Sequence, residues 1–182
     1  MLPRIIGLNG PSRAGKDETA SILVRHFDYE QRAQAASIRD ILLGLNPLIK
    51  DDNGELWTMR GLFEYYNENW DEVKAVSRES TDYMIRLGQT ARDVIGVNIW
   101  LNTAFPPIGS LKKVVVSDIR QLNEFEAVKA RGGEVWKINR PGVELRGMDG
   151  LLDHLEFDEY IDNDGTLEQL EAQVLDRMKG KL

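Results

Sequence analysis

The chain has 182 residues, which is the length of one domain with room for a small inserted subdomain. Its 23 Lys and Arg against 30 Asp and Glu give a net charge of −7, which argues against a dedicated nucleic-acid-binding protein because duplex affinity depends on clustered cations. The absence of Cys excludes disulfides, thiolate zinc sites and cysteine nucleophiles. No apolar stretch approaches the roughly 18 residues of a membrane span, so the sequence predicts a cytoplasmic protein with no membrane partner.

The first half of the chain begins with a buried strand and continues mainly as helices. An apolar run over 5–8 predicts the strand, and apolar positions at helical spacing predict a helix over 16–27. A short second strand is expected within the polar residues 28–36, and Ser37 is the expected N-cap of a helix that ends near Leu45.

The middle of the chain predicts a loop and then a helical region. Turn-forming residues fill 46–60, and 61–105 has a helical pattern with breaks near 67–71 and Gly96. Three consecutive valines within 113–117 are typical of a buried parallel strand.

The last third predicts two more strands and two helices. A helix through Phe125 and Val128 ends at two glycines, and a strand over 134–139 follows. A polar segment over 140–156 leads to a short strand over 159–161. The final helix is expected over 167–178.

Strands separated by helices indicate an α/β fold, in three layers, with helices on both faces of a parallel sheet. We expect a single domain over 1–182, in which a helical insertion at about 46–106 separates core segments 1–45 and 111–182. Ligands of such sheets bind at the carboxyl ends of the strands.

The first strand runs directly into a glycine-rich loop that opens a helix. Such a loop directs backbone N–H groups and a helix N-terminus at one point, where an anionic phosphate chain can bind, and its lysine reaches the outer phosphates. Asp17 stands where a hydroxyl normally holds Mg²⁺, so it is a candidate metal ligand; alternatively, Asp17 and Glu18 only favour the helix start. The expected ATP-binding residues here are Gly10, Arg13, Ala14, Gly15, Lys16, Asp17, Glu18 and Thr19.

Phosphoryl transfer requires phosphates held in line, Mg²⁺ and cations that neutralise developing charge. Asp118 follows the valine strand and could hold Mg²⁺, or it could cap the next helix. Arg120 could contact phosphate or simply pair with Asp118. The segment 140–156 has the composition of a lid, with Arg140 at its hinge and Arg146 within it. Lys16, Asp17, Arg120 and Arg140 are therefore the expected catalytic residues.

Several motifs resemble those of the bacteriophage deoxynucleoside monophosphate kinases, and they occur in the same order along nearly the whole chain. These kinases are P-loop enzymes that convert dNMPs to dNDPs with ATP. Their loop reads Ser-Gly-Lys-Asp-Thr, so Asp17 is what the resemblance implies, whereas Glu18 departs from it. The matching segments are Ala14-Gly15-Lys16-Asp17-Glu18, Ala35-Ala36-Ser37-Ile38-Arg39-Asp40, Ile85-Arg86-Leu87-Gly88-Gln89-Thr90-Ala91-Arg92-Asp93, Asn98-Ile99-Trp100, the segment from Val115 to Glu124, Arg140-Pro141-Gly142 and the segment from Asp162 to Glu168.

The resemblance implies a P-loop kinase fold, ATP and Mg²⁺ as cofactors, and small nucleotides as substrates. It implies that Arg39, Arg86 and Arg92 lie near the acceptor phosphate and that Asn163, Asp164 and Gly165 border the adenine. Gln89 and Asp118 are the further expected acceptor-binding residues, and Asp17 and Asp118 are the expected metal ligands. For a phage-encoded chain the compartment is the host cytoplasm. Whether the protein forms a homodimer stays open.

Two alternatives remain at this stage. A P-loop kinase of similar sequence could phosphorylate a hydroxymethylated pyrimidine base within phage DNA, although the acidic composition argues against a DNA partner. Alternatively, the chain could be a non-catalytic nucleotide-binding module whose Asp17 and Glu18 weaken the metal site.

Overall fold

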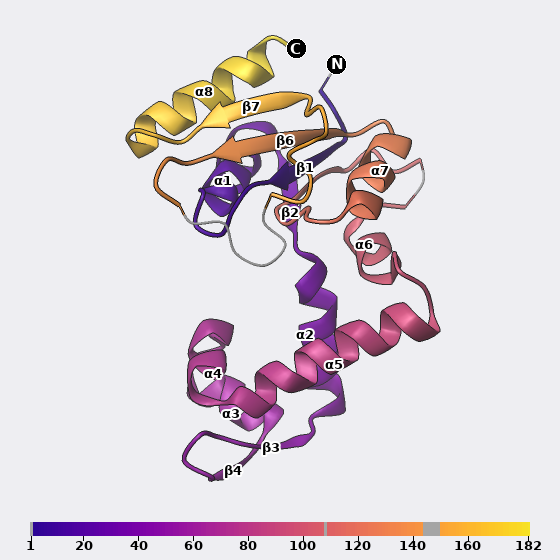
Figure 1. The fold of residues 1–182 in the computed structure, drawn as a ribbon, viewed down its shortest axis with the longest axis vertical. Helices are drawn as coiled ribbons and strands as arrows, with labels where there is room; N and C mark the ends of the chain where they lie inside the picture. Colours follow the sequence, from indigo (N-terminus) through magenta and orange to yellow (C-terminus); the bar gives the residue numbers. More distant parts are fainter. Residues whose placement is uncertain (1, 108, 144–149) are drawn as a thin grey trace. The chain divides into compact units, whose positions relative to one another are not determined.

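The computed structural model describes residues 2–107, 109–143 and 150–182, and its chain divides into two compact units (Figure 1). The core unit comprises Met1–Ala33 and Ala104–Leu182, and the helical unit comprises Gln34–Thr103. The helical unit therefore begins with α2 (Gln34–Leu45), which the sequence analysis had placed in the core. The reason is that α2 packs against α3 (Met59–Tyr65) and α5 (Arg78–Val94) of the same unit.

In the described part of the core unit, five parallel strands form one sheet in the order β2-β5-β1-β6-β7. This confirms the predicted α/β class with a parallel sheet and puts β1 at its centre. The carboxyl ends of all five strands lie along one edge of the sheet, where ligands of such sheets bind. The strands are β1 (Ile5–Asn9), β2 (Tyr29–Arg32), β5 (Lys113–Val116), β6 (Glu134–Asn139) and β7 (Glu159–Asp162).

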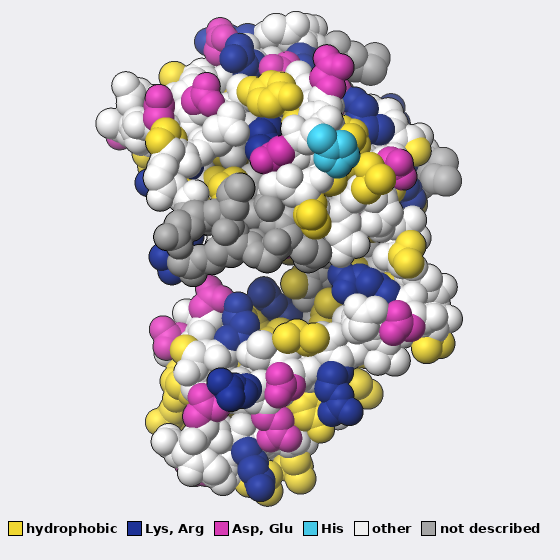
Figure 2. Space-filling view, in the orientation of Figure 1, with side chains coloured by type: hydrophobic (Ala, Val, Ile, Leu, Met, Phe, Trp, Pro, Cys, Tyr) yellow, Lys and Arg dark blue, Asp and Glu magenta, His cyan; other side chains and the backbone are white. Residues whose placement is uncertain are grey.

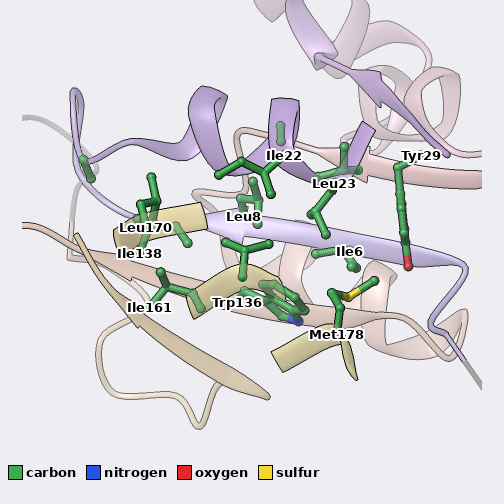
Figure 3. Packing of buried hydrophobic residues seen from close by; sticks show 14 residues of the cluster. Ile6, Leu8, Ile22, Leu23, Tyr29, Trp136, Ile138, Ile161, Leu170 and Met178 are labelled. Carbon is green, nitrogen blue, oxygen red and sulfur yellow. The ribbon is translucent and has the colours of Figure 1, made fainter. Parts of the chain in front are cut away.

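Helices cover both faces of this sheet. On one face, α1 (Lys16–Phe27) and α8 (Leu167–Lys179) pack their apolar side chains on the strands, and Ile22, Leu170 and Trp136 belong to the cluster of buried hydrophobic residues there (Figure 3). On the other face, α7 (Leu122–Ala130) packs on β1 and β6, and a Cβ on Gly7 would be in ordinary contact with Val128, at 3.4 Å. The three-layer arrangement was thus predictable from the alternation of strands and helices.

The helical unit has its own apolar core, formed by Leu42, Ile49, Met59, Leu62 and Val73. Besides α2, α3 and α5 it contains α4 (Trp70–Val76), most of α6 (Ile99–Ala104), and an antiparallel hairpin of β3 (Leu48–Lys50) and β4 (Leu56–Thr58).

The hairpin corrects one expectation, because residues 46–60 had been assigned to a loop. Its turn is organised by Asp51, whose carboxylate accepts the backbone N–H groups of Asn53 and Glu55. Because β3 and β4 have only three residues each, they leave little alternation in the sequence to detect.

Of the segment expected to form a lid, 140–156, residues 144–149 lie outside the described residues, and Arg146 lies with them. Residues 150–156 form turns without helix or strand. Within the described ranges, no helix is both long and apolar enough to span a membrane.

Candidate functional site

The loop between β1 and α1 has a backbone that only glycine can supply at its two ends. Gly10 has φ 149° and Gly15 has φ 103°, both in the region that side chains disfavour. Space is also lacking: a Cβ on Gly10 would lie 2.4 Å from the carbonyl oxygen of Ile138, and one on Gly15 would lie 2.3 Å from Nδ2 of Asn163. Glycine is therefore favoured at both positions by the backbone conformation and by the lack of space for a side chain.

Lys16 is the first residue of α1, and its side chain returns into the loop. Its ammonium Nζ donates to the carbonyl oxygens of Gly10 and Pro11, at 2.8 Å each, and the residue is buried. The N-terminus of a helix carries unpaired N–H groups and a partial positive charge, both of which favour an anion. The loop thus combines a held ammonium with the N-terminus of a twelve-residue helix, an arrangement suited to phosphate.

Two side chains from distant parts of the core unit hold the outside of the loop. The amide Nδ2 of Asn163 donates to the carbonyl oxygen of Ala14 at 2.8 Å, and Nη1 of Arg140 donates to that of Arg13 at 3.3 Å. Asn163 follows β7 and Arg140 follows β6, so the parallel sheet brings both to the loop. The structure therefore uses the Asn163 amide to brace the loop, a contact that spacing in the sequence could not reveal.

The neighbours of Asn163 lie at the start of α8. Asp164 and Gly165 are exposed, and a Cβ on Gly165 would lie 2.0 Å from the side-chain oxygen of Gln169. That oxygen also accepts the backbone N–H of Thr166, which caps α8. A side chain at position 165 would thus displace the Gln169 side chain from the cap of this helix.

The three residues after Lys16 have different environments. Asp17 is exposed and accepts a hydrogen bond from Nε2 of Gln31, at 3.2 Å, while Glu18 is half-buried. Thr19 is fully buried, and its hydroxyl oxygen has no hydrogen-bond partner among the described residues. Asp17 therefore offers a carboxylate to solvent, whereas the hydroxyl of Thr19 is enclosed by the protein.

Asp118 and Arg120 follow β5 at the same edge of the sheet. Nε of Arg120 lies 2.6 Å from Oδ1 of Asp118, and both side chains are partly exposed. The backbone N–H of Arg120 also donates to the carboxylate of Glu124, which takes part in the capping box of α7. The ion pair that the sequence left as an alternative for these two residues is thus present.

Within the described ranges, no three His, Asp or Glu side chains gather to hold a metal ion. A Mg²⁺ ion does not require such a group, because it is usually held by one or two carboxylates together with phosphate oxygens and water. Asp17, beside the loop, provides one carboxylate of the kind that Mg²⁺ prefers.

A cavity of about 370 Å³ adjoins the loop in the core unit. Its volume falls within the range of small-molecule sites. Charges of both signs line it, and the lining residues are Pro11, Lys137, Asn139, Arg140, Pro141, Val143, Asp153, Asp162 and Asp164.

In the helical unit, Arg39 of α2 lies over an aromatic ring. Its guanidinium carbon is 5.8 Å from the centroid of Trp70, and its Nε is buried without a hydrogen-bond partner among the described residues. A hydrogen bond from Lys74, the charge of Lys74 and the charge of Arg39 together hold the pKa of Asp71 below its ordinary value. Arg39 is thus oriented by Trp70 while one of its donors stays unused.

The other predicted acceptor residues of the helical unit lie on α5. Arg86 is exposed, Arg92 is half-buried close to Gly88, and Gln89 donates from Nε2 to Oδ1 of Asp93 at 2.8 Å. Figure 2 shows several Lys and Arg side chains on the visible face of this unit, interspersed with Asp and Glu.

The sequence analysis missed a buried polar group beside the loop. Lys137 in β6 donates to Oδ1 of Asn9 at 2.9 Å and to the carboxylate of Asp153. A signal was present, because a lysine between the apolar Trp136 and Ile138 in a buried strand requires partners.

No protein-family model matches the chain, and no curated protein matches its sequence. Among solved structures, it is similar to shikimate kinase from Aquifex aeolicus, at 13% identity over 97% of each chain and a TM-score of 0.45. It is also similar to the APS kinase CysC of Mycobacterium tuberculosis in complex with AMPPNP and APS, at 12% identity over 98% of this chain and 99% of that one, with a TM-score of 0.46. A third is dephospho-CoA kinase from Campylobacter jejuni, at 14% identity over 97% and 96% and a TM-score of 0.45.

Proposed function

We propose that the protein is a Mg²⁺-dependent phosphotransferase that moves the γ-phosphate of ATP to a deoxynucleoside monophosphate. The observation that carries this proposal is the Lys16 ammonium, held by the carbonyl oxygens of Gly10 and Pro11 at the N-terminus of α1. A strand, a glycine loop and a helix with a lysine in this position form a phosphate site. The choice of acceptor rests on the resemblance to the phage kinases.

On the donor side, the loop and Lys16 would bind the β- and γ-phosphates, and the adjoining cavity would take the nucleoside. Arg140 already reaches the loop through Arg13, so its guanidinium is placed to contact a phosphate oxygen. Arg120 would supply further positive charge where charge develops on the transferred group.

Mg²⁺ fits the donor set beside the loop, which consists of carboxylate oxygens. Asp17 would hold the ion directly or through water, and Asp118, which follows β5 at the same edge of the sheet, is the second candidate. When bound, Mg²⁺ neutralises charge on the phosphates.

On the acceptor side, Arg39, Arg86 and Arg92 of the helical unit are the candidates for the phosphate of the monophosphate. Arg39 is the strongest, because Trp70 orients its guanidinium and its Nε has no partner among the described residues. Arginine suits a phosphate because its donors are arranged as a planar fork.

The direct test supplies ATP and Mg²⁺ with each common deoxynucleoside and ribonucleoside monophosphate, and in a separate reaction with hydroxymethylpyrimidine DNA. Product diphosphates are separated by ion-exchange chromatography. We expect dNDP formation, a loss of at least about a hundredfold in Lys16→Ala because it removes a charge aimed at the transferred phosphate, and no comparable loss in Lys129→Ala.

Lys129 is a suitable control because its ion pair with Asp158 lies at the start of β6, at the opposite edge of the sheet from the loop. If phosphate were transferred to the DNA and to no monophosphate, DNA would be the acceptor in place of the deoxynucleoside monophosphate. ATP binding without any transfer would identify a non-catalytic nucleotide-binding module.

A further inference from the structure

A buried lysine in the sheet, Lys137, lies beside the phosphate loop and lines the cavity proposed for the nucleoside. The side chain of Lys137 is only 10% exposed. Its Nζ donates to Oδ1 of Asn9 and to the carboxylate of Asp153, and it lies 5.3 Å from the ring centroid of Phe157. Removing an ammonium from water is costly unless it is paired and hydrogen-bonded, so these partners are what allow the charge to remain there.

Asn9 uses both ends of its side-chain amide. Oδ1 accepts from Lys137, while Nδ2 donates to the carbonyl oxygen of Ile119 at 2.7 Å. Because an ammonium can only donate, it fixes which end of the amide is the oxygen. Asn9 is the last residue of β1 and directly precedes Gly10, so its side chain ties the start of the loop to two neighbouring parts of the core unit.

The backbone of β6 also touches the start of the loop. Gly10 lies so close to the carbonyl oxygen of Ile138 that no Cβ would fit between them. Gly10 in turn supplies one of the two carbonyl oxygens that hold the ammonium of Lys16. The sequence of contacts from Lys137 to Asn9, Gly10 and Lys16 is therefore continuous.

We propose that Lys137 is a positioning residue of the nucleotide loop, which acts through Asn9 and is kept in place by the charge of Asp153. This inference rests on the proposed function, since it assumes that the loop binds ATP. Lys137 and Asp153 also line the cavity proposed for the nucleoside, but the ammonium of Lys137 is engaged by Asn9 and Asp153. Lys137 fixes the point where the chain leaves β1, and small misplacements of groups that bind a substrate have large effects.

The competing explanation is that the pair between Lys137 and Asp153 only stabilises the sheet. The two explanations differ in what a substitution changes: a structural role lowers the melting temperature alone, whereas a positioning role also weakens nucleotide binding. Lys137→Met keeps much of the apolar stem and removes the charge. Lys129→Met is the matched control, because it removes a lysine that pairs with Asp158 at the other end of β6.

The experiment is a calorimetric titration of the full chain with AMPPNP and Mg²⁺, together with thermal unfolding of each variant. Leaving the buried oxygen of Asn9 unpaired in Lys137→Met should raise the Kd for AMPPNP about tenfold. In Lys129→Met the Kd should stay within about twofold of the wild-type value. In turnover assays, the KM for ATP should rise in Lys137→Met and the KM for the acceptor should not.

If Lys137→Met does not fold, Asp153→Asn provides a second test of the same contact. Asp153 is half-exposed, so the amide is tolerated, and the lysine loses only its counter-charge. We expect a smaller rise in the Kd, of about threefold.

Wild-type affinity in both variants, with a lowered melting temperature, would overturn the inference and leave the proposed function standing. Absence of AMPPNP binding to the wild-type protein would overturn the nucleotide loop and the inference with it.

Discussion

The conformation of Gly15 provides a quantitative test of the loop. Replacing it by Ala places a Cβ on a residue with φ 103°, and that Cβ would lie 2.3 Å from Nδ2 of Asn163. A side chain held in a sparsely populated backbone region costs about 1–3 kcal/mol. The clash also displaces the amide that donates to Ala14, and a lost hydrogen bond costs about 1 kcal/mol. We therefore expect Gly15→Ala to lower the free energy of unfolding by about 2–4 kcal/mol.

The assay is urea unfolding followed by far-ultraviolet circular dichroism. Hydrogen exchange read by mass spectrometry on peptides from 5–27 then assigns the loss to the core unit. Gly44→Ala is the control: Gly44 lies in α2 with nothing within 4 Å of the added Cβ, so the substitution should stabilise by about 0.5–1 kcal/mol.

A double-mutant cycle separates the two parts of the cost. In an Asn163→Ala background the clash is absent, so Gly15→Ala should cost about 1 kcal/mol less than it does in the wild type. An equal cost in both backgrounds would show that Asn163 is not the obstacle. A Gly15→Ala protein as stable as wild type would refute the loop geometry altogether.

Two further predictions concern other residues. Arg39→Ala should raise the KM for the monophosphate about tenfold or more, with little change in the KM for ATP, because it removes a charged phosphate contact. The control is Arg60→Ala, which removes an exposed guanidinium of the same unit. If Arg39→Ala left both KM values unchanged, the proposed acceptor site would be misplaced. Burial, and secondarily the charge of Glu134, raises the pKa of Tyr29 above its ordinary 10.0. The stability that the neutral Tyr29 hydroxyl contributes should therefore be complete below about pH 10 and be lost as the pH rises above it. Tyr29→Phe also lacks the hydrogen bond to Pro3, so it should be less stable than wild type at pH 7 and approach it near pH 11 in urea unfolding; a constant difference would contradict this.

The geometry of the loop between β1 and α1 could be predicted because its signals are local. Gly10, Gly15 and Lys16 occur at fixed spacing between an apolar run and a helical pattern, and the structure shows a backbone reason for both glycines. Strand β5 was predicted to within one residue, since a continuous apolar run identifies a buried parallel strand. Strand β6 was predicted with its observed bounds, 134–139. The short hairpin of β3 and β4 was not, because three-residue strands leave too little pattern.

The roles of the residues around the loop were harder to predict, because they depend on contacts between distant segments. The expectation that Asn163 borders the adenine stays a prediction; the contact that the structure shows, from its amide to the carbonyl oxygen of Ala14, joins residues 149 positions apart in the sequence. Asn9 and Lys137 were not singled out at all, and their pairing depends on β1 and β6 being neighbours.

The sequence by itself determined that the chain has a glycine loop followed by a lysine between a strand and a helix of a parallel α/β fold, because glycine spacing and apolar periodicity are properties of neighbouring residues. Only the tertiary structure decided the strand order that places β6 and β7 beside β1. That order determines which side chains reach the loop: Arg140 and Asn163 brace it, and Lys137 ties down its first residue through Asn9. The physical reason is that buried donors and charges must find partners across the sheet, and which partners are near is fixed by strand neighbours and not by sequence distance.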